Sequence, residues 1–165
     1  MLAKNGVPTS EELREKLPTQ QRLQMGPVAI IECFQPIPCD PCYHSCVRGA
    51  INKFDDINDI PELDDNKCTG CGICVSSCPG LAIFVVDATY QQGYGLIKLP
   101  YELLPLPEKG EEVEALDRKG EKVCKAEVVE VRASQRQDKT AVIGLKVPLE
   151  YLMEVRNIRV RGARR

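Results

Sequence analysis

Side chains suited to acid–base or nucleophilic catalysis are scarce in this sequence. Its 165 residues include one histidine, His44, and no accompanying serine and aspartate set. A phosphate loop of the G-x-G-x-x-G type is also missing, and the Gly-Tyr-Gly at 93–95 is better explained as a turn. We therefore expect no independent active site, and we expect His44 to be an ordinary polar residue of the surface or of a helix.

Long apolar segments and a strong net charge are missing as well. No stretch approaches the roughly 20 apolar residues that a membrane helix requires. The first 20 residues lack the apolar run and cleavage site of a signal peptide. Net charge is −2, and residues 28–84 are acidic, with three basic and eight acidic side chains, which argues against nucleic-acid binding there. These features predict a cytoplasmic protein that binds neither membrane nor nucleic acid.

Cysteine, by contrast, is abundant. The chain has nine cysteines, and eight of them lie between residues 33 and 78. This density indicates disulfides in a small secreted protein or metal ligands in an intracellular one. Because we expect a reducing compartment, we interpret the eight as metal ligands. The ninth, Cys124, lies in an alternating segment and is expected to serve as a small apolar side chain.

The second cysteine group has the ligand run of a bacterial-type iron–sulfur cluster, because residues 68–79 read C-x₂-C-x₂-C-x₃-C-P. Two-residue gaps let the backbone wrap around a compact cubane. Gly70 and Gly72 permit positive φ angles and a close backbone approach to the cluster. The alternative is a zinc site built from two C-x₂-C pairs, but zinc leaves four of the eight cysteines unexplained.

The first cysteine group is a modified copy of the second at an offset of 32 residues, with Cys39, Cys42 and Cys46 falling on Cys71, Cys74 and Cys78. In proteins with two such clusters, the fourth cysteine of each run binds the other cluster. We therefore expect cluster B to be bound by Cys68, Cys71, Cys74 and Cys46. Cluster A has Cys39, Cys42 and Cys78, and the position of its fourth ligand is occupied by Pro36.

Three hypotheses remain for the fourth ligand of cluster A. In the first, which we favour, Cys33 completes a [4Fe–4S] cluster, while residues 34–38, stiffened by two prolines, bulge outward. In the second, the ligand is missing and cluster A is a [3Fe–4S] form. In the third, cluster A is absent.

The patterns around the cysteines predict an α+β fold. Residues 1–27 are expected to form an N-terminal docking arm, with a short helix over 9–17 capped by Thr9 or Ser10. Residues 28–99 are expected to form the two-cluster domain, in which each half reads as strand, cysteine loop, short helix and strand.

The remainder, residues 100–165, is expected to form a small β-barrel or sandwich domain. It begins with a proline-punctuated linker over 100–107 and continues with three antiparallel strands. A closing C-terminal helix is predicted over 148–157. The last ten residues hold five arginines, which we expect to meet carboxylates or a cofactor phosphate on a partner.

The motif CTGCGICVSSCPG and its modified copy CFQPIPCDPCYHSC resemble the two-cluster bacterial ferredoxin family over residues 28–84. The resemblance implies a compact fold with pseudo-twofold symmetry. It also implies two [4Fe–4S] clusters that lie close enough together for fast electron transfer.

The whole arrangement further resembles the small iron–sulfur subunits that accompany flavin-dependent amino-acid or amine dehydrogenases of anaerobes. That resemblance implies a hetero-oligomer with FAD or FMN on partner subunits, and a soluble electron acceptor. The predicted function is thus an electron-transfer subunit that relays single electrons through two [4Fe–4S] clusters. The alternatives are a free-standing ferredoxin-like carrier and a redox-sensing or structural iron–sulfur protein.

Overall fold

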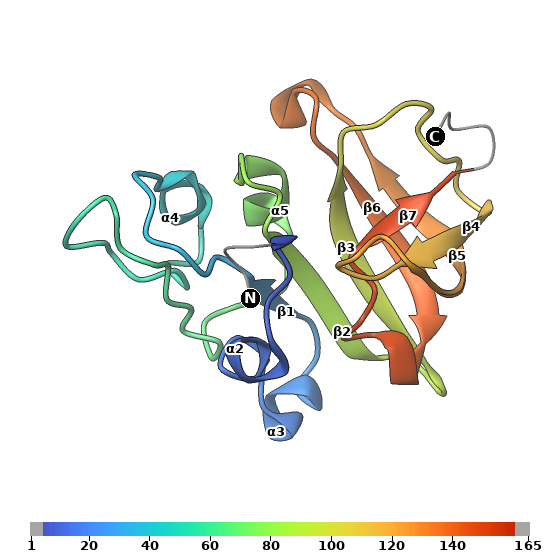
Figure 1. The fold of residues 1–165 in the computed structure, drawn as a ribbon, viewed down its shortest axis with the longest axis horizontal. Coiled ribbons are helices and arrows are strands. Elements are labelled where there is room, and N and C mark those ends of the chain that lie inside the picture. Colours follow the sequence, from blue (N-terminus) through green and yellow to red (C-terminus); the bar gives the residue numbers. More distant parts are fainter. Residues whose placement is uncertain (1–4, 161–165) are drawn as a thin grey trace.

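A computed structural model describes residues 5–160 of the chain. Within that range, antiparallel strands form one seven-stranded sheet in the order β1-β2-β3-β6-β5-β4-β7 (Figure 1). The strands are β1 (Val28–Ile31), β2 (Ile83–Gln91), β3 (Tyr94–Tyr101), β4 (Glu112–Leu116), β5 (Lys122–Arg132), β6 (Ala141–Pro148) and β7 (Asn157–Arg159). The helices are short: α2 (Ser10–Arg14), α3 (Gln20–Leu23), α4 (Pro41–Ser45) and α5 (Ile73–Ser77), with 3₁₀ turns at Gln135–Gln137 and Leu149–Tyr151.

The sheet curls so that its two edge strands approach each other. Glu32 directly follows β1, and Arg156 directly precedes β7. The Arg156 Nε donates a 2.8 Å hydrogen bond to the Glu32 carboxylate. Residues 124 positions apart are thus joined, and the curled sheet encloses the main hydrophobic core.

Two cores lie on opposite faces of the sheet near β1 and β2. All four residues of β1 are buried. Val28 and Ile30 point into the main core, whereas Ala29 and Ile31 point into a second core, as the two-residue period of a strand requires. Cys42 and Cys74 belong to the second core. The cysteine-rich loops with α4 and α5 therefore cover the outer face of this part of the sheet (Figure 1).

The N-terminal segment forms a helix that is shorter than expected, over residues 10–14 instead of 9–17, and it is anchored to the rest of the chain. Thr9 caps α2 in a capping box with Glu12, which confirms the predicted start of the helix. Leu23 of α3 is buried in the main core. Arg22 is 6% exposed, and its guanidinium donates to the backbone carbonyls of four residues, Asp65, Gly26, Pro27 and Cys68. This segment is thus tied to the loop that holds the second cysteine group.

The predicted C-terminal strands are confirmed, but the predicted closing helix over 148–157 is wrong. Residues 149–151 form only a 3₁₀ turn, and the chain then enters β7. The Arg156 N–H donates to the Leu116 carbonyl at 2.8 Å, so pairing with β4 draws this segment into the sheet. Leu152 and Val155 are buried in the main core, and their apolar spacing reflects that packing rather than a helix.

The expected division of the chain at residues 99 and 100 falls inside β3. In the structure, Leu99 pairs with Ile143 and Pro100 with Val142, so one sheet runs through both predicted parts. The division into two domains stays a prediction. In the arginine-rich tail, Arg159 pairs with Glu114 of the same chain, and the positions 161–165 lie outside the described residues.

Candidate metal centre

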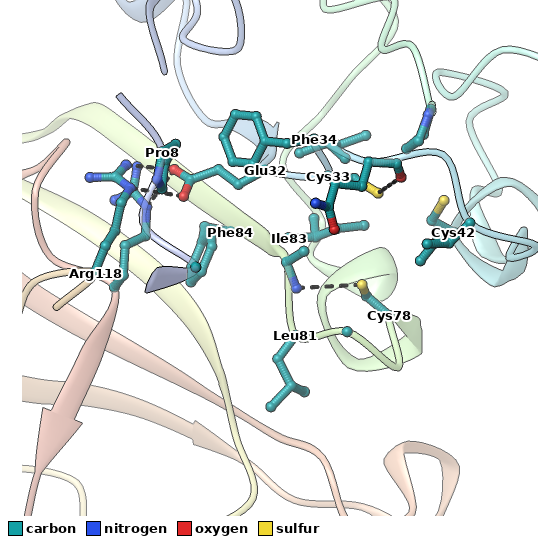
Figure 2. Close-up of a pocket in the computed structure, with 18 of the residues that line it drawn as sticks. Pro8, Glu32, Cys33, Phe34, Cys42, Cys78, Leu81, Ile83, Phe84 and Arg118 are labelled. Carbon is teal, nitrogen blue, oxygen red and sulfur yellow. Dashed lines mark hydrogen bonds and ion pairs between the residues drawn. The ribbon is translucent and has the colours of Figure 1, made fainter. Parts of the chain in front are cut away.

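Four thiols line one cavity of about 530 Å³, and we call this set site A: Cys33, Cys39, Cys42 and Cys78. Cys33 follows the end of β1, and Cys78 caps the C-terminus of α5. Figure 2 shows Cys33, Cys42 and Cys78 around one space. The segment 35–38 between the first two cysteines is exposed, as the outward bulge requires. Cys33 thus lies with the three thiols that the 32-residue offset associates with cluster A.

The remaining four thiols of the two groups line a second, narrower cavity, and we call this set site B: Cys46, Cys68, Cys71 and Cys74. Cys46 is the C-cap of α4, and Cys74 lies inside α5. Cys71 is exposed, whereas Cys74 is buried. Each site therefore receives one thiol from the end of the helix that belongs to the other cysteine group.

Backbone N–H groups donate to three of these sulfurs. The donors and acceptors are Ala29 N to Cys68 Sγ at 3.3 Å, Ala50 N to Cys46 Sγ at 3.3 Å, and Ala82 N to Cys78 Sγ at 3.4 Å. Such bonds favour the thiolate. Burial alone would raise the pKa of Cys46, but the N–H groups of Ala50 and its neighbours outweigh burial and lower it.

The two most buried thiols show the opposite shift. Burial, with a smaller effect from neighbouring sulfurs, raises the pKa of Cys42 to about 11 and that of Cys74 to about 12. These thiols are protonated at neutral pH in the metal-free chain, so metal binding must release their protons. Within residues 5–160, no three His, Cys, Asp or Glu side chains stand close enough to hold a single metal ion. Each site offers four sulfur donors, which is the donor set of a [4Fe–4S] cluster.

Gly70 and Gly72 line the cavity of site B. Their φ angles are +63° and +80°, in the left-handed region that glycine occupies without strain. A Cβ on Gly70 would lie 2.9 Å from the backbone carbonyl carbon of Pro27, and a Cβ on Gly72 would meet the flexible guanidinium of Arg132 at 2.7 Å. Gly70 therefore permits the close approach between the N-terminal segment and the second cysteine group.

Gly70→Ala is expected to displace the loop that carries Cys68 and Cys71. The positive φ costs about 1–2 kcal/mol, and the overlap with Pro27 adds about 1–3 kcal/mol. Anaerobic thermal unfolding and iron analysis measure the effect. The matched control is Gly93→Ala, because Gly93 has a φ of +77° but a Cβ added there would meet no heavy atom within 4 Å. Equal losses of stability and iron in the two variants would contradict the expected role of Gly70.

Cys124 and His44, which we did not expect to be cluster ligands, lie outside both sites. Cys124 lies on β5, half-buried against the main core. His44 is exposed on α4, where its Nε2 lies 3.0 Å from the Asp40 carboxylate. Neither residue lines the cavity of site A or of site B.

Three charged residues, Glu32, Arg118 and Arg156, line the same cavity as the thiols of site A. Sequence reasoning missed Glu32 and Arg118, and it expected Arg156, in the arginine-rich tail, to meet a carboxylate on a partner rather than Glu32 of the same chain. Arg118 lies between β4 and β5, and Arg156 lies before β7. No local motif marks these positions, since Arg118 and Arg156 are 86 and 124 residues from Glu32. Only the curling of the sheet brings the three side chains together.

Two sets of four cysteine sulfurs are typical of iron–sulfur proteins. Comparison with known families agrees, because residues 61–84 match the 4Fe-4S binding domain. This range contains all four cysteines of the second group. The chain therefore carries a ferredoxin-type iron–sulfur segment.

Curated relatives are similar to part of the chain. Over 47 residues it is 43% identical to pyruvate synthase subunit PorD of Methanothermobacter marburgensis, covering 28% of this chain and 51% of the relative. It is also 43% identical over 47 residues to a subunit of the ion-translocating oxidoreductase complex of Methanosarcina acetivorans, covering 28% and 17%. An uncharacterized ferredoxin of Methanocaldococcus jannaschii is 32% identical over 79 residues, covering 43% and 46%.

The chain thus spans about half or less of the length of these relatives. No solved structure matches it. Among the helices of the described residues, none has the length and apolar character needed to cross a membrane.

Proposed function

We propose that residues 28–84 form a pseudo-twofold unit that holds two [4Fe–4S] clusters. Three features that recur at the 32-residue offset support this symmetry. Helix α4 spans residues 41–45 and α5 spans 73–77. The N–H···S bond from Ala50 to Cys46 recurs from Ala82 to Cys78. The antiparallel pairing of Ile31 with Ile83 has its counterpart in the bridge between Leu63 and Ile51.

A fourth feature concerns the backbone after each crossing cysteine. Gly49 and Leu81 occupy equivalent positions, and both have positive φ angles, +59° and +51°. The N–H of each donates to the carbonyl of the cysteine three residues earlier, at 3.0 Å in the first copy and 3.1 Å in the second. Leu81 adopts this conformation without being glycine, which indicates that the turn after Cys78 is required by its surroundings.

The proposed cluster ligands are the thiols that line the two cavities. Site A would hold its cluster through Cys33, Cys39, Cys42 and Cys78, and site B through Cys46, Cys68, Cys71 and Cys74. The observation that carries this assignment is the exchange of Cys46 and Cys78, each of which lines the cavity of the other cysteine group. Clusters of this type supply reversible one-electron chemistry when bound.

We further propose that the chain is an electron-transfer subunit of a multisubunit oxidoreductase. The names of two relatives describe subunits of larger enzymes, pyruvate synthase and an ion-translocating oxidoreductase complex. The exposed Cys71 brings site B to the surface, where electrons can pass to another protein. The proposed partners are subunits that carry FAD or FMN, in the cytoplasm of an anaerobe, together with a soluble electron acceptor.

A free-standing ferredoxin-like carrier is the second candidate, and a specific observation favours it. The segments expected to dock on partners already have partners within the chain. Arg22 and Leu23 are buried at the N-terminal side, while Arg156 and Arg159 pair with Glu32 and Glu114 near the other end. These contacts reduce the need for a second subunit to order these segments.

Anaerobic purification from the native host tests both proposals. We expect about eight irons per chain, since two four-iron clusters are proposed, and co-purification with a flavin-containing protein. About four irons would contradict a cluster at site A. If the chain has its full iron content but elutes alone from a sizing column, the result would support the function of a free-standing carrier.

A further inference from the structure

An ion cluster of one carboxylate and two guanidinium groups lies directly beside site A. Arg118 binds Glu32 through two hydrogen bonds, from Nε at 2.9 Å and from Nη2 at 2.5 Å. Arg156 donates from Nε to the same carboxylate at 2.8 Å. Glu32 immediately precedes Cys33, and Figure 2 shows Glu32 and Arg118 at one side of the cavity and Cys42 and Cys78 at the other.

The ion cluster of Glu32, Arg118 and Arg156 carries an excess positive charge that the protein buries. The side chains of Arg156 and Glu32 are only 4% and 8% exposed. Burial lowers the pKa of Arg156 to about 10, so the guanidinium remains charged at neutral pH. Burial opposes ionisation of Glu32, but the two arginines outweigh it and lower its pKa. Two cations thus share one anion.

Among residues 5–160, Glu32 is the only carboxylate that forms an ion pair with Arg156. Its Nη2 is buried and has no hydrogen-bond partner among the described residues, while its Nη1 donates to the Val155 carbonyl at 2.6 Å. The guanidinium carbon lies 4.9 Å from the centre of the Phe84 ring, a contact that holds the cation in place. Excess buried positive charge is costly unless a further negative charge lies close by.

Two other carboxylates line the cavity of site A, Asp59 and Asp117. Asp59 is exposed and accepts the N–H groups of Asp55 and Asp56. Asp117 is half-buried and accepts N–H groups from Lys119 and Glu121. Solvent screens charges near the surface more strongly than buried ones, so these carboxylates balance Arg156 only weakly.

We propose that Arg156 raises the reduction potential of the cluster at site A, with Glu32 and Arg118 holding its charge in position. This inference rests on the proposed [4Fe–4S] cluster at that site. Reduction adds one negative charge to the cluster, and a nearby buried cation stabilises the added charge because the local dielectric is low. Arg156 is therefore a positioning and tuning residue rather than a ligand.

Site B has a comparable cation on a different element. Arg22 is buried and makes no ion pair within the described residues. Its Nη2 donates to the Cys68 carbonyl at 2.9 Å. Because Arg156 lines the cavity of site A and not that of site B, its removal should shift the potential of site A more than that of site B.

The test is Arg156→Met in the full chain, followed by an EPR-monitored redox titration. This substitution leaves Glu32 and Arg118 as a matched ion pair. We expect the reduction equilibrium of site A to become about tenfold less favourable, a fall of about 59 mV for a one-electron couple. Arg156→Lys, which keeps the charge, should restore most of the potential. Arg159→Met serves as the control, because Arg159 is half-exposed and pairs with Glu114 away from the cavity.

Glu32→Gln provides a second test with the opposite sign. It removes the only carboxylate of the ion cluster, so the potential of site A should rise. Unchanged potentials in both variants, or equal shifts at sites A and B, would overturn the proposal. Loss of iron from site A in both variants would also overturn it, because the ion cluster would then serve only to hold Cys33. A deficit of iron in the unsubstituted chain would instead count against the two-cluster function.

Discussion

Cys46→Ser is expected to damage the cluster at site B, although Cys46 belongs to the first cysteine group of the sequence. Cys46 lines the cavity of site B together with the thiols of the second group. A serine oxygen replaces one of four sulfur ligands, so the cluster should be lost or strongly altered. Anaerobic iron analysis and EPR of the reduced protein measure the result. We expect site B to be affected and the signal of site A to persist.

The reciprocal variant makes this prediction specific. Cys78→Ser should damage site A and spare site B, because Cys78 lines the other cavity. Cys124→Ser is the matched control, since that thiol lies on β5 outside both cavities. If Cys46→Ser affected only the cluster of its own sequence group, the crossed assignment would be wrong.

Cys33→Ser has the second of the two largest expected effects. Cys33 is the only thiol of site A that the 32-residue offset does not supply, since its place in the copy is taken by Pro36. Without it, one iron has no cysteine ligand, and site A should convert to a three-iron form. We expect about seven irons per chain instead of about eight, together with an EPR signal in the oxidised state that the unsubstituted protein lacks.

The competing hypotheses give different results in the same experiment. If the unsubstituted chain already contains about seven irons and the oxidised three-iron signal, Cys33 is not a ligand. If Cys33→Ser leaves iron content and spectrum unchanged, another group completes site A. Pro36→Ala is a useful control, because Pro36 is exposed in the segment 35–38 and should leave the iron content unaltered.

Local sequence signals predicted a large part of the fold. The Thr9 cap of α2 and the strands β4, β5 and β6 could be predicted because capping and two-residue alternation act between near neighbours. The prediction of a closing helix was wrong because a distant contact, and not the local signal, decided the structure there. Leu152 and Val155 have helical spacing, but the pairing of β7 with β4 decided the conformation of their segment.

The candidate site, like the fold, could be predicted from the sequence only in part. The 32-residue offset, with the crossing of the fourth cysteine, associated seven of the eight cysteines in two sets, and Cys33 was the favoured candidate for the remaining position. The two cavities contain those same sets, with Cys33 beside Cys39, Cys42 and Cys78. The assignment to clusters stays a prediction until iron is measured. Nothing in the pattern indicated Arg22 or Arg118, since a charged residue has no periodic signature that distinguishes a buried site from a solvated face. Arg156 was noted only as part of an arginine-rich tail, and its carboxylate partner was expected on another subunit.

The sequence by itself determined the donor chemistry, because spacing within a short loop controls which thiols can reach one centre. It also indicated α2, α4, α5 and most strands, whose signals lie within a few residues of each other, but not α3. Only the tertiary structure decided that Glu32 meets Arg118 and Arg156, because the sheet must curl before its two edges approach. Contacts across such separations depend on the packing of the whole core, and this packing places a buried positive charge beside site A.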